Sequence, residues 1–263
     1  MLTDTHVHFR EAMTPDEIAG MVGRASAAGV GRLIAVGCEP DANAAALRVA
    51  AMFPECVKAA VAYDRSLAGT GARVEGIREL ILSAPVGHVA AIGELGLDFH
   101  YTPETAEAQQ ALMVEQLALA RELRLPVIVH SREADQETVA LLSAHARQWG
   151  GGSDRIGVLH CFTGTESLAR QLLDLGFMIS FSGIVTFRNA DLLREVARGI
   201  PADRLLIETD TPYLTPVPHR GRPNEPCYLP AIAALLARVR GMDVEELAGL
   251  TTANSEKLFG SGL

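Results

Sequence analysis

Hydrophobic residues gather in eight short, continuous runs, and each run is followed by a polar turn. Because the runs are continuous rather than alternating, they are typical of parallel strands that are buried on both faces. The predicted strands span Leu2–Phe9, Arg32–Gly37, Val57–Tyr63, Val89–Gly93, Pro126–His130, Ile156–His160, Phe177–Ser182 and Leu205–Glu208.

The segments between these runs carry apolar residues at helical spacing and predict helices. They span Thr14–Ala28, Pro40–Phe53, Arg73–Ser83, Pro103–Leu123, Arg132–Arg147, Glu166–Leu175 and Ala190–Arg198. Thr102 is placed to cap the longest of them, with Pro103 at the first helical position. Two further helices, Pro226–Arg240 and Asp243–Phe259, are expected to pack on the outside.

Eight alternations of strand and helix predict an α/β protein with a (β/α)₈, or TIM, barrel. The alternative is an open doubly wound sheet, but its usual G-x-G-x-x-G marker after the first strand is absent. A length of 263 residues fits one large barrel or two modest domains. Since no linker or change of composition divides the chain, we expect a single domain over residues 1–263.

Composition and charge narrow the class of protein. With 48% hydrophobic and 21% charged residues, the chain has ordinary globular usage. The net charge of −9 argues against broad, non-specific binding to nucleic acid, although a local basic rim or bound metal can still attract phosphate. The four cysteines are scattered without a C-x-x-C pair, which favours reduced thiols.

The sequence contains neither a signal-peptide pattern nor an apolar stretch long enough to span a bilayer. We therefore expect a cytoplasmic protein with no membrane association. No feature of the sequence indicates an obligate protein partner.

Metal-competent side chains recur at the ends of the predicted strands, where the working residues of a (β/α)₈ barrel lie. His6 and His8 are two residues apart on the first strand, so both side chains point to the same side. Single residues close four other strands. These are Glu94, His130, His160 and Asp210, on the fourth, fifth, sixth and eighth strands.

Any one of these residues alone would fit a structural role, but six at equivalent positions converge on one axis. Imidazoles and carboxylates that face one another are most simply satisfied by cations. Four imidazoles and two carboxylates exceed the needs of one tetrahedral ion, so we predict two divalent ions with a bridging carboxylate. Imidazole-rich ligation favours Zn, Mn, Fe or Co, and Mg stays open.

Other polar residues are candidates for substrate binding. The loop after the eighth strand carries Arg220 and Arg222, whose guanidinium groups suit phosphate oxygens; a solvated basic loop is the alternative. Arg132 and His100 are further candidates, with the reach of His100 left open. His88 and His145 are expected on the surface.

Taken in order, these motifs resemble the TatD-type metal-dependent hydrolases, a branch of the amidohydrolase-like TIM barrels that includes deoxyribonucleases. The resemblance runs from Asp4 to about Phe259, and six motifs in order make it specific. They are Asp4-Thr5-His6-Val7-His8, Gly93-Glu94-Leu95-Gly96-Leu97-Asp98, Leu125-Pro126-Val127-Ile128-Val129-His130-Ser131-Arg132, His160-Cys161-Phe162-Thr163-Gly164, Glu208-Thr209-Asp210-Thr211-Pro212-Tyr213-Leu214 and Arg220-Gly221-Arg222-Pro223-Asn224-Glu225-Pro226.

The resemblance implies a role for each predicted ligand. It implies that His6 and His8 hold one metal, that His130 and His160 hold the other, and that Glu94 bridges them. Asp210 would bind the first metal and accept the proton of the attacking water. One departure is visible: the family usually has an acidic residue where Arg10 stands, which puts the substrate rim in question.

We therefore predict a divalent-metal-dependent hydrolase of ester bonds in which Asp210 and Glu94 are catalytic. The favoured substrate is DNA or a small phosphoester, cleaved as by a 3′-5′ exonuclease. A carboxylic ester or amide is the alternative, because the same centre activates water without choosing the electrophile. A non-catalytic metal-binding protein is the third interpretation, and it predicts a closed coordination site.

Overall fold

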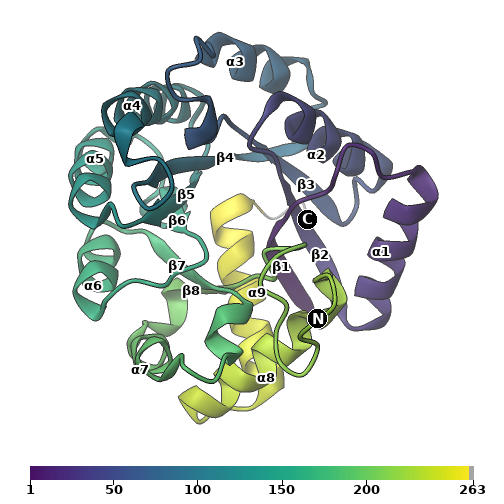
Figure 1. Cartoon of the computed structure of the whole chain (residues 1–263). Helices are drawn as coiled ribbons and strands as arrows, with labels where there is room; N and C mark the ends of the chain where they lie inside the picture. The colour runs from purple at the N-terminus through teal and green to yellow at the C-terminus, as the bar shows by residue number, and fades with distance from the viewer. Residues whose placement is uncertain (261–263) are drawn as a thin grey trace.

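Eight parallel strands form one sheet in the computed structural model, which describes residues 1–260 (Figure 1). They pair in chain order, each with its neighbour in sequence. The strands are β1 (Leu2–Val7), β2 (Val30–Val36), β3 (Val57–Val61), β4 (Val89–Asp98), β5 (Val127–Arg132), β6 (Gly157–Leu159), β7 (Met178–Phe181) and β8 (Leu205–Ile207).

The sheet closes where the chain after β8 meets β1. Val7 forms a parallel bridge with Thr211, and the His8 amide donates to the Thr211 carbonyl at 2.9 Å. The Asp210 amide donates to the His6 carbonyl at 3.0 Å. These contacts confirm the predicted (β/α)₈ barrel, and they lie beside three of the predicted ligands.

Of the nine helices in residues 1–260, eight surround the barrel in a ring and the last lies across one of its ends (Figure 1). They are α1 (Pro15–Ala27), α2 (Pro40–Met52), α3 (Val74–Ser83), α4 (Ala106–Leu123), α5 (Asp135–Gln148), α6 (Glu166–Asp174), α7 (Asp191–Gly199), α8 (Leu229–Arg240) and α9 (Val244–Phe259). Short 3₁₀ turns are η1 (Arg65–Leu67), η2 (Pro103–Thr105), η3 (Ser153–Arg155), η4 (Gly183–Thr186), η5 (Ala202–Arg204) and η6 (Pro226–Tyr228).

The threonines that precede two of the predicted helices, Thr14 and Thr102, differ in whether their side chains cap a helix. At α1, the Thr14 hydroxyl accepts from the Glu17 amide at 3.3 Å, and the Glu17 carboxylate accepts from the Thr14 amide at 2.7 Å, which completes a capping box. The prediction that Thr102 caps a helix with its side chain is wrong. Thr102 precedes a 3₁₀ turn, and its hydroxyl is taken instead by Gln109 Nε2 at 3.0 Å.

Strand β4 is longer than predicted and runs on to Asp98. Glu94 therefore lies within the strand rather than at its end. The pairing of β4 with β5 shifts in register, since Ile92 pairs with Val127 but Leu95 pairs with Val129. Strand β4 therefore has one more residue than β5 between these two pairs. Such an extra residue re-aims the neighbouring side chains. Gly96 follows with a φ of +146°, and a Cβ atom there would overlap the carbonyl oxygen of His130.

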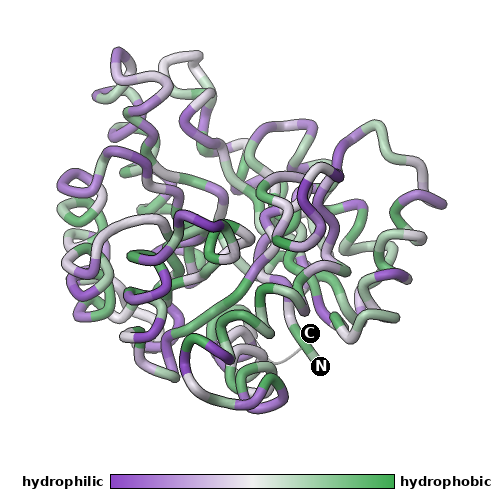
Figure 2. The backbone as a smooth tube through the Cα atoms, turned by 60° about the horizontal axis from the view of Figure 1, so that its bottom comes forward, coloured by the Kyte–Doolittle hydropathy of each residue, from purple (hydrophilic) through white to green (hydrophobic). Residues whose placement is uncertain are grey.

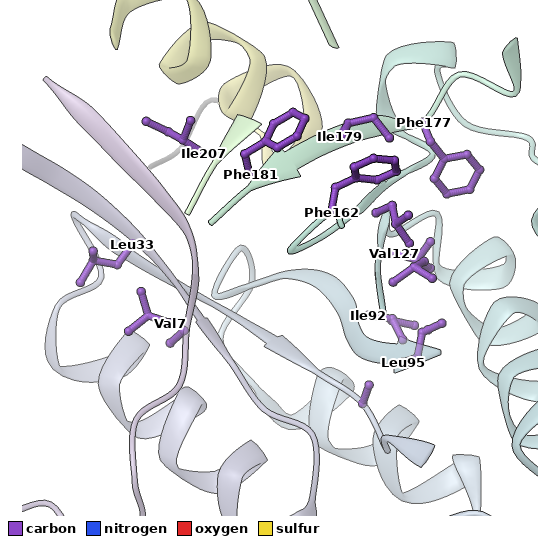
Figure 3. Packing of buried hydrophobic residues seen from close by; sticks show 14 of the residues in the cluster. Val7, Leu33, Ile92, Leu95, Val127, Phe162, Phe177, Ile179, Phe181 and Ile207 are labelled. Atoms are coloured by element: carbon purple, nitrogen blue, oxygen red, sulfur yellow. The ribbon is translucent and has the colours of Figure 1, made fainter. Parts of the chain in front are cut away.

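Two apolar layers hold the fold together. The larger lies between the strands and the helices, and Figure 3 shows part of it, with Phe162 and Phe181 in edge contact at 5.9 Å between ring centroids. The second fills the barrel and includes Ile34, Ile128 and Met178. Figure 2 shows hydrophobic residues along the central strands and hydrophilic residues on the outer turns, as both layers require.

The prediction that both late helices pack on the outside is wrong for α9. Helix α8 takes the eighth place in the ring, whereas α9 contacts β1, β8 and the 3₁₀ turns before β6 and β8 (Figure 1). Its Leu258 and Phe259 pack with the side chains inside the barrel. Since these contacts lie where strands begin, α9 closes the amino-terminal end and leaves the other end free for a site.

Within residues 1–260, no helix is long and apolar enough to cross a membrane. The cytoplasmic location stays a prediction. So does the single domain over residues 1–263, whose last three residues lie outside the described residues.

Candidate metal centre

All six predicted ligands meet at the carboxyl-terminal mouth of the barrel. Three groups of three place their ligand atoms within 4.8 Å of one another, two of them made only of predicted ligands and the third made of His6, His160 and Glu208. The first group is His6, His8 and Asp210, and the second is Glu94, His130 and His160. The convergence that was predicted from strand ends is therefore present in the structure.

Glu94 lies between two pairs of histidines, and each of its oxygens faces one pair. Its Oε2 atom is 3.4 Å from His6 Nε2 and 3.5 Å from His8 Nε2. Its Oε1 atom is 3.3 Å from His130 Nδ1 and 3.5 Å from His160 Nε2. One carboxylate thus joins the two halves of the cluster.

Hydrogen bonds on the outer side of the rings fix which nitrogens face the centre. His8 Nδ1 lies 3.0 Å from the Val36 carbonyl oxygen, which can only accept, so Nδ1 carries the proton. The neutral ring then presents the Nε2 lone pair, which faces His6 Nε2 at 3.0 Å and Asp210 Oδ1 at 3.7 Å.

The same logic orients His160. Its Nδ1 atom lies 3.2 Å from Glu208 Oε1, and this oxygen also accepts from the Cys161 amide at 2.6 Å. His160 Nε2 then points at Glu94 and is buried without a hydrogen-bond partner. His130 is held by Asp98, whose Oδ2 atom is 3.4 Å from His130 Nε2.

The cluster is suited to cations. Lone pairs of imidazole nitrogens and carboxylate oxygens point at one another, and His6, His160 and Glu94 are only 0%, 5% and 6% exposed. Burying such groups without a partner costs free energy that a cation or a proton between them recovers. A histidine ligand must be neutral with its free lone pair turned inward, as the bonds of His8 and His160 dictate.

Burial and the charges of neighbouring groups shift the pKa values of these side chains in different directions. Burial, reinforced by the charge on His160, lowers the pKa of His6 to about 4. Although burial opposes it, Glu94 and Glu208 hold the pKa of His160 well above its usual range. Also against burial, the neighbouring histidines hold the pKa of Glu94 well below its usual range. Against burial, Glu94 and Asp210 also raise the pKa of His8. Both His160 and His8 therefore favour a proton, and with it a positive charge, when cations are absent.

Asp210 has a different environment from the other carboxylates. Its burial raises its pKa to about 7, against the opposing pull of His160 and His8. Its backbone has a φ of +59°, a conformation that costs about 1–3 kcal/mol and is retained where function needs the direction of a side chain. A carboxylate that titrates near neutrality is matched to proton transfer.

The sequence analysis missed three residues of the site. Arg65, in the turn after β3, donates to Glu94 Oε1 at 3.1 Å and lies 3.6 Å from Asp98 Oδ2. Asp98 and Glu208 orient His130 and His160, as described above. The signal was present for all three, because each follows or ends a barrel strand as the predicted ligands do.

The predicted substrate-binding residues lie around the rim rather than in the cluster. Arg132 packs over the Tyr101 ring, with its guanidinium carbon 4.6 Å from the ring centroid. His100 is exposed, and its Nδ1 atom is 2.7 Å from Glu133 Oε1. Arg222 is exposed in the loop after β8. Their roles as phosphate ligands stay predictions.

The structure also places three other residues that the sequence singled out. Arg220 packs on Phe187 at 4.2 Å from the ring centroid and donates to the Thr215 carbonyl at 3.1 Å. Arg10 is exposed. The prediction that His145 is a surface residue is wrong, since it is 0% exposed on α5 and its Nδ1 atom lies 3.2 Å from Arg121.

A cleft of 1380 Å³ opens beside His160 and runs outward between α6 and α7. Its lining mixes apolar residues with six carboxylate side chains, among them Glu133, Glu166 and Glu195, and with two arginines, Arg132 and Arg170. The acidic lining repels anions, so this route from the centre is a poor path for a phosphate chain.

The closed barrel and the cluster of histidines and carboxylates at its mouth define the class of protein, a (β/α)₈ barrel of the metal-dependent hydrolase type. The match to known families is more specific. The chain belongs to the TatD related DNase family, whose model matches residues 3–260. The resemblance that the motifs predicted is thereby confirmed.

Individual relatives agree with this placement. The chain is 52% identical over 186 residues to the uncharacterized metal-dependent hydrolase YcfH of Escherichia coli K12, covering 71% of this chain and 67% of that one. It is 38% identical over 245 residues to the 3′-5′ ssDNA/RNA exonuclease TatD of Citrobacter rodentium, covering 91% and 90%. The crystal structure of YjjV, a TatD homologue from Escherichia coli K12, superposes with a TM-score of 0.86 at 31% identity, covering 98% and 97%.

Proposed function

We propose that this chain hydrolyses phosphodiester bonds in nucleic acid with two divalent cations, and that it removes nucleotides from the 3′ end. The observation that carries the proposal is the position of Glu94, with one oxygen toward each pair of histidines. The relative named as a 3′-5′ ssDNA/RNA exonuclease supports the choice of substrate and polarity.

The residues that would hold the cations divide into two sets. His6, His8 and Asp210 would hold one cation, together with Glu94 Oε2. His130 and His160 would hold the other, together with Glu94 Oε1. When bound, such cations lower the pKa of water toward about 7 and neutralise charge on phosphoryl oxygens.

Asp210 would act as the general base. Its carboxylate lies at the mouth beside His8, and its raised pKa of about 7 lets it take a proton from water near neutral pH. After bond cleavage the same carboxyl group can return that proton to the leaving oxygen. Its positive-φ backbone conformation, held by the hydrogen bond from the Asp210 amide to the His6 carbonyl, fixes the direction of the carboxylate.

Arg65 would supply a fixed positive charge at the same place. Its guanidinium group bonds to Glu94 and lies near Asp98, yet its side chain is 25% exposed and faces the mouth. A partly desolvated guanidinium group suits phosphoryl oxygens, whose negative charge it can stabilise during attack. Glu208 would act through His160 by keeping its Nδ1 atom protonated.

The test is hydrolysis by metal-free protein reloaded with Mg²⁺, Mn²⁺ or Zn²⁺. The substrates are a 5′-labelled single-stranded oligonucleotide, bis(p-nitrophenyl) phosphate, and p-nitrophenyl acetate as the acyl alternative. We expect a metal-dependent ladder that shortens from the 3′ end. Removing a centre ligand with His160→Ala should lower the rate by about 10³-fold or more.

His88→Ala is the matched control, because it removes a histidine that precedes β4 and so lies at the end of the barrel opposite to the mouth. It should keep the wild-type rate and metal dependence. Metal-dependent turnover of the acyl ester with none of either phosphodiester would overturn the proposal, and so would full activity in His160→Ala.

A further inference from the structure

Two aromatic side chains are exposed, and both lie at the mouth of the barrel. Among the large apolar side chains of residues 1–260 that reach solvent, the aromatic ones are Tyr101 and Tyr213, with 67% and 62% of their surface exposed. The other tyrosines, phenylalanines and the tryptophan of this range are buried or half-buried. Exposed rings placed beside a catalytic centre suit a ligand that has flat faces of its own.

Each tyrosine is tied to the centre through an aspartate three residues earlier, Tyr101 through the aspartate side chain and Tyr213 through the aspartate backbone. The Tyr101 amide donates to Asp98 Oδ1 at 3.1 Å, and the other oxygen of Asp98 is 3.4 Å from His130 Nε2. The Tyr213 amide donates to the Asp210 carbonyl at 2.8 Å. Asp210 in turn lies 3.7 Å from His8 Nε2. Each half of the centre therefore has one tyrosine fixed beside it.

The two tyrosines follow strands that lie on opposite sides of the barrel. Tyr101 follows β4 and Tyr213 follows β8. In an eight-stranded barrel that pairs in chain order, these strands are four places apart in either direction. A ligand that touches both rings therefore passes over the centre, where Glu94 joins the two halves.

Each ring is also held in place at its edge or on one face. Arg132 packs over Tyr101 at 4.6 Å from the centroid, and His100 meets the same ring edge-on at 4.8 Å. Tyr213 meets the His8 ring edge-on at 6.2 Å. A guanidinium group on an aromatic face fixes the ring and places positive charge next to it, a combination that proteins use to bind single-stranded nucleic acid.

The negative net charge of the chain favours binding of nucleic acid through base stacking over binding through a broad basic surface. With a net charge of −9 and an acidic cleft beside His160, the protein lacks a broad basic track for a phosphate backbone. Stacking of bases on aromatic rings contributes affinity without a positive surface, and it tolerates any sequence because every base has a flat face. Bases in a duplex are already stacked on their neighbours and offer no free face within the helix.

We propose that Tyr101 and Tyr213 are base-stacking platforms for single-stranded nucleic acid, one on each side of the phosphodiester that is cut. This inference rests on the proposed phosphodiesterase activity and names the residues that select single strands. The nucleotides on either side of the bond stack on the two rings, and Arg132 contacts the backbone beside Tyr101.

The test compares substrates that do and do not reach the rings. Tyr101→Leu and Tyr213→Leu keep an apolar side chain without a stacking face, and Tyr101→Phe and Tyr213→Phe keep the face. On a single-stranded oligonucleotide, each Leu variant should lose about five- to hundredfold in kcat/KM more than it loses on bis(p-nitrophenyl) phosphate. The Phe variants should recover most of that loss. Val114→Ala, at an exposed site on α4, is the control.

A substrate series locates each platform. An abasic nucleotide on the matching side of the cleaved bond should slow the wild-type enzyme as much as the Leu substitution does. Combining the two changes should cost no more than either one alone. RNA and DNA oligonucleotides should respond alike, and a blunt duplex should be the poorer substrate for the wild-type enzyme.

Two results would overturn the platforms and can be told apart. If the wild-type enzyme hydrolyses neither phosphodiester with any metal, the proposed function fails and the platforms fail with it. If it hydrolyses both, and the Leu variants match the Phe variants on the oligonucleotide, only the platforms are wrong. Thermal unfolding of each variant confirms that the compared proteins are folded.

Discussion

The two ends of this barrel bury different kinds of side chain, apolar at one end and polar at the other. At the end where strands begin, α9 places Leu258 and Phe259 among apolar side chains inside the barrel. At the end where strands finish, histidines and carboxylates are buried, and the Nδ1 atom of His6 and the Nε2 atom of His160 have no hydrogen-bond partner. The first end contributes free energy of folding, because apolar surface leaves water there. At the second end, the burial of polar groups costs free energy of folding, which a bound cation would offset.

This difference predicts that substitutions at the two ends have separate effects. A change at the mouth should lower activity while leaving the stability of metal-free protein unchanged or improved. A change at the closed end should lower stability while leaving kcat unchanged in the molecules that remain folded. Proteins commonly exchange stability for function in this way at active sites.

The largest expected effect is on activity, from Asp210→Asn. Asparagine has the same shape and tolerates the positive φ of this position, so the backbone should be kept. Loss of the general base should lower kcat by about 10²–10⁴-fold. Steady-state kinetics on bis(p-nitrophenyl) phosphate measures it.

The same variant has a predicted stability signature. Because burial raises the folded-state pKa of Asp210 to about 7, ionisation of this group at higher pH opposes folding. At pH 8, metal-free Asp210→Asn should therefore resist urea better than metal-free wild type, and the difference should vanish as the pH falls below 4. A variant that is less stable at pH 8 would contradict the division between the two ends.

The next effect is on stability, from Phe259→Ala. This ring is 2% exposed and packs inside the barrel, so its removal should cost about 3–5 kcal/mol of the free energy of unfolding. Urea denaturation measures this cost, and kcat per folded molecule should match that of the wild type. Leu82→Ala, at a side chain that is 68% exposed, should change stability by less than about 0.5 kcal/mol. A large fall in kcat with Phe259→Ala would show that the two ends are not independent.

The smallest predicted effect concerns His145, a buried histidine that lies at neither end of the barrel and so serves as a reference for both. Burial, with the charge of Arg121, lowers the pKa of His145 to about 4. In the unfolded chain the group is protonated below about 6.5, so acid favours unfolding between these two values. His145→Phe should reduce the acid-induced loss of stability by about 1–3 kcal/mol between pH 7.5 and pH 4. Parallel stability curves for the two proteins across this range would rule out the assignment.

Much of this arrangement could be predicted, because a barrel turns positions in sequence into positions in space. Continuous apolar runs locate the strands, and the polar residue after a run marks the mouth. Hence His130 and Asp210, which are far apart in sequence, could be placed together before any coordinates. The geometry bears out that convergence, while the binding of cations by these residues stays a prediction.

What could not be predicted depended on details that an apolar pattern does not record. The extra residue in β4 turns Glu94 inward from within the strand, and a run that ends at Gly93 gives no sign of it. The pattern of α9 is that of an ordinary amphipathic helix, so its place inside the ring was hidden. His145 resembles a surface residue in sequence because its burial depends on how α5 packs. Arg65 could not be placed because it lies in a turn four residues beyond the end of β3, so the apolar pattern does not show that its side chain returns to Glu94.

The most direct test of the proposed two-cation centre is a crystal structure of the protein loaded with Mn²⁺, recorded at a wavelength where manganese scatters anomalously. We expect two anomalous peaks per chain, one next to His6, His8 and Asp210 and one next to His130 and His160, with Glu94 between them. A single peak, or peaks that leave Glu94 outside their contacts, would contradict the claim that this carboxylate joins two cations.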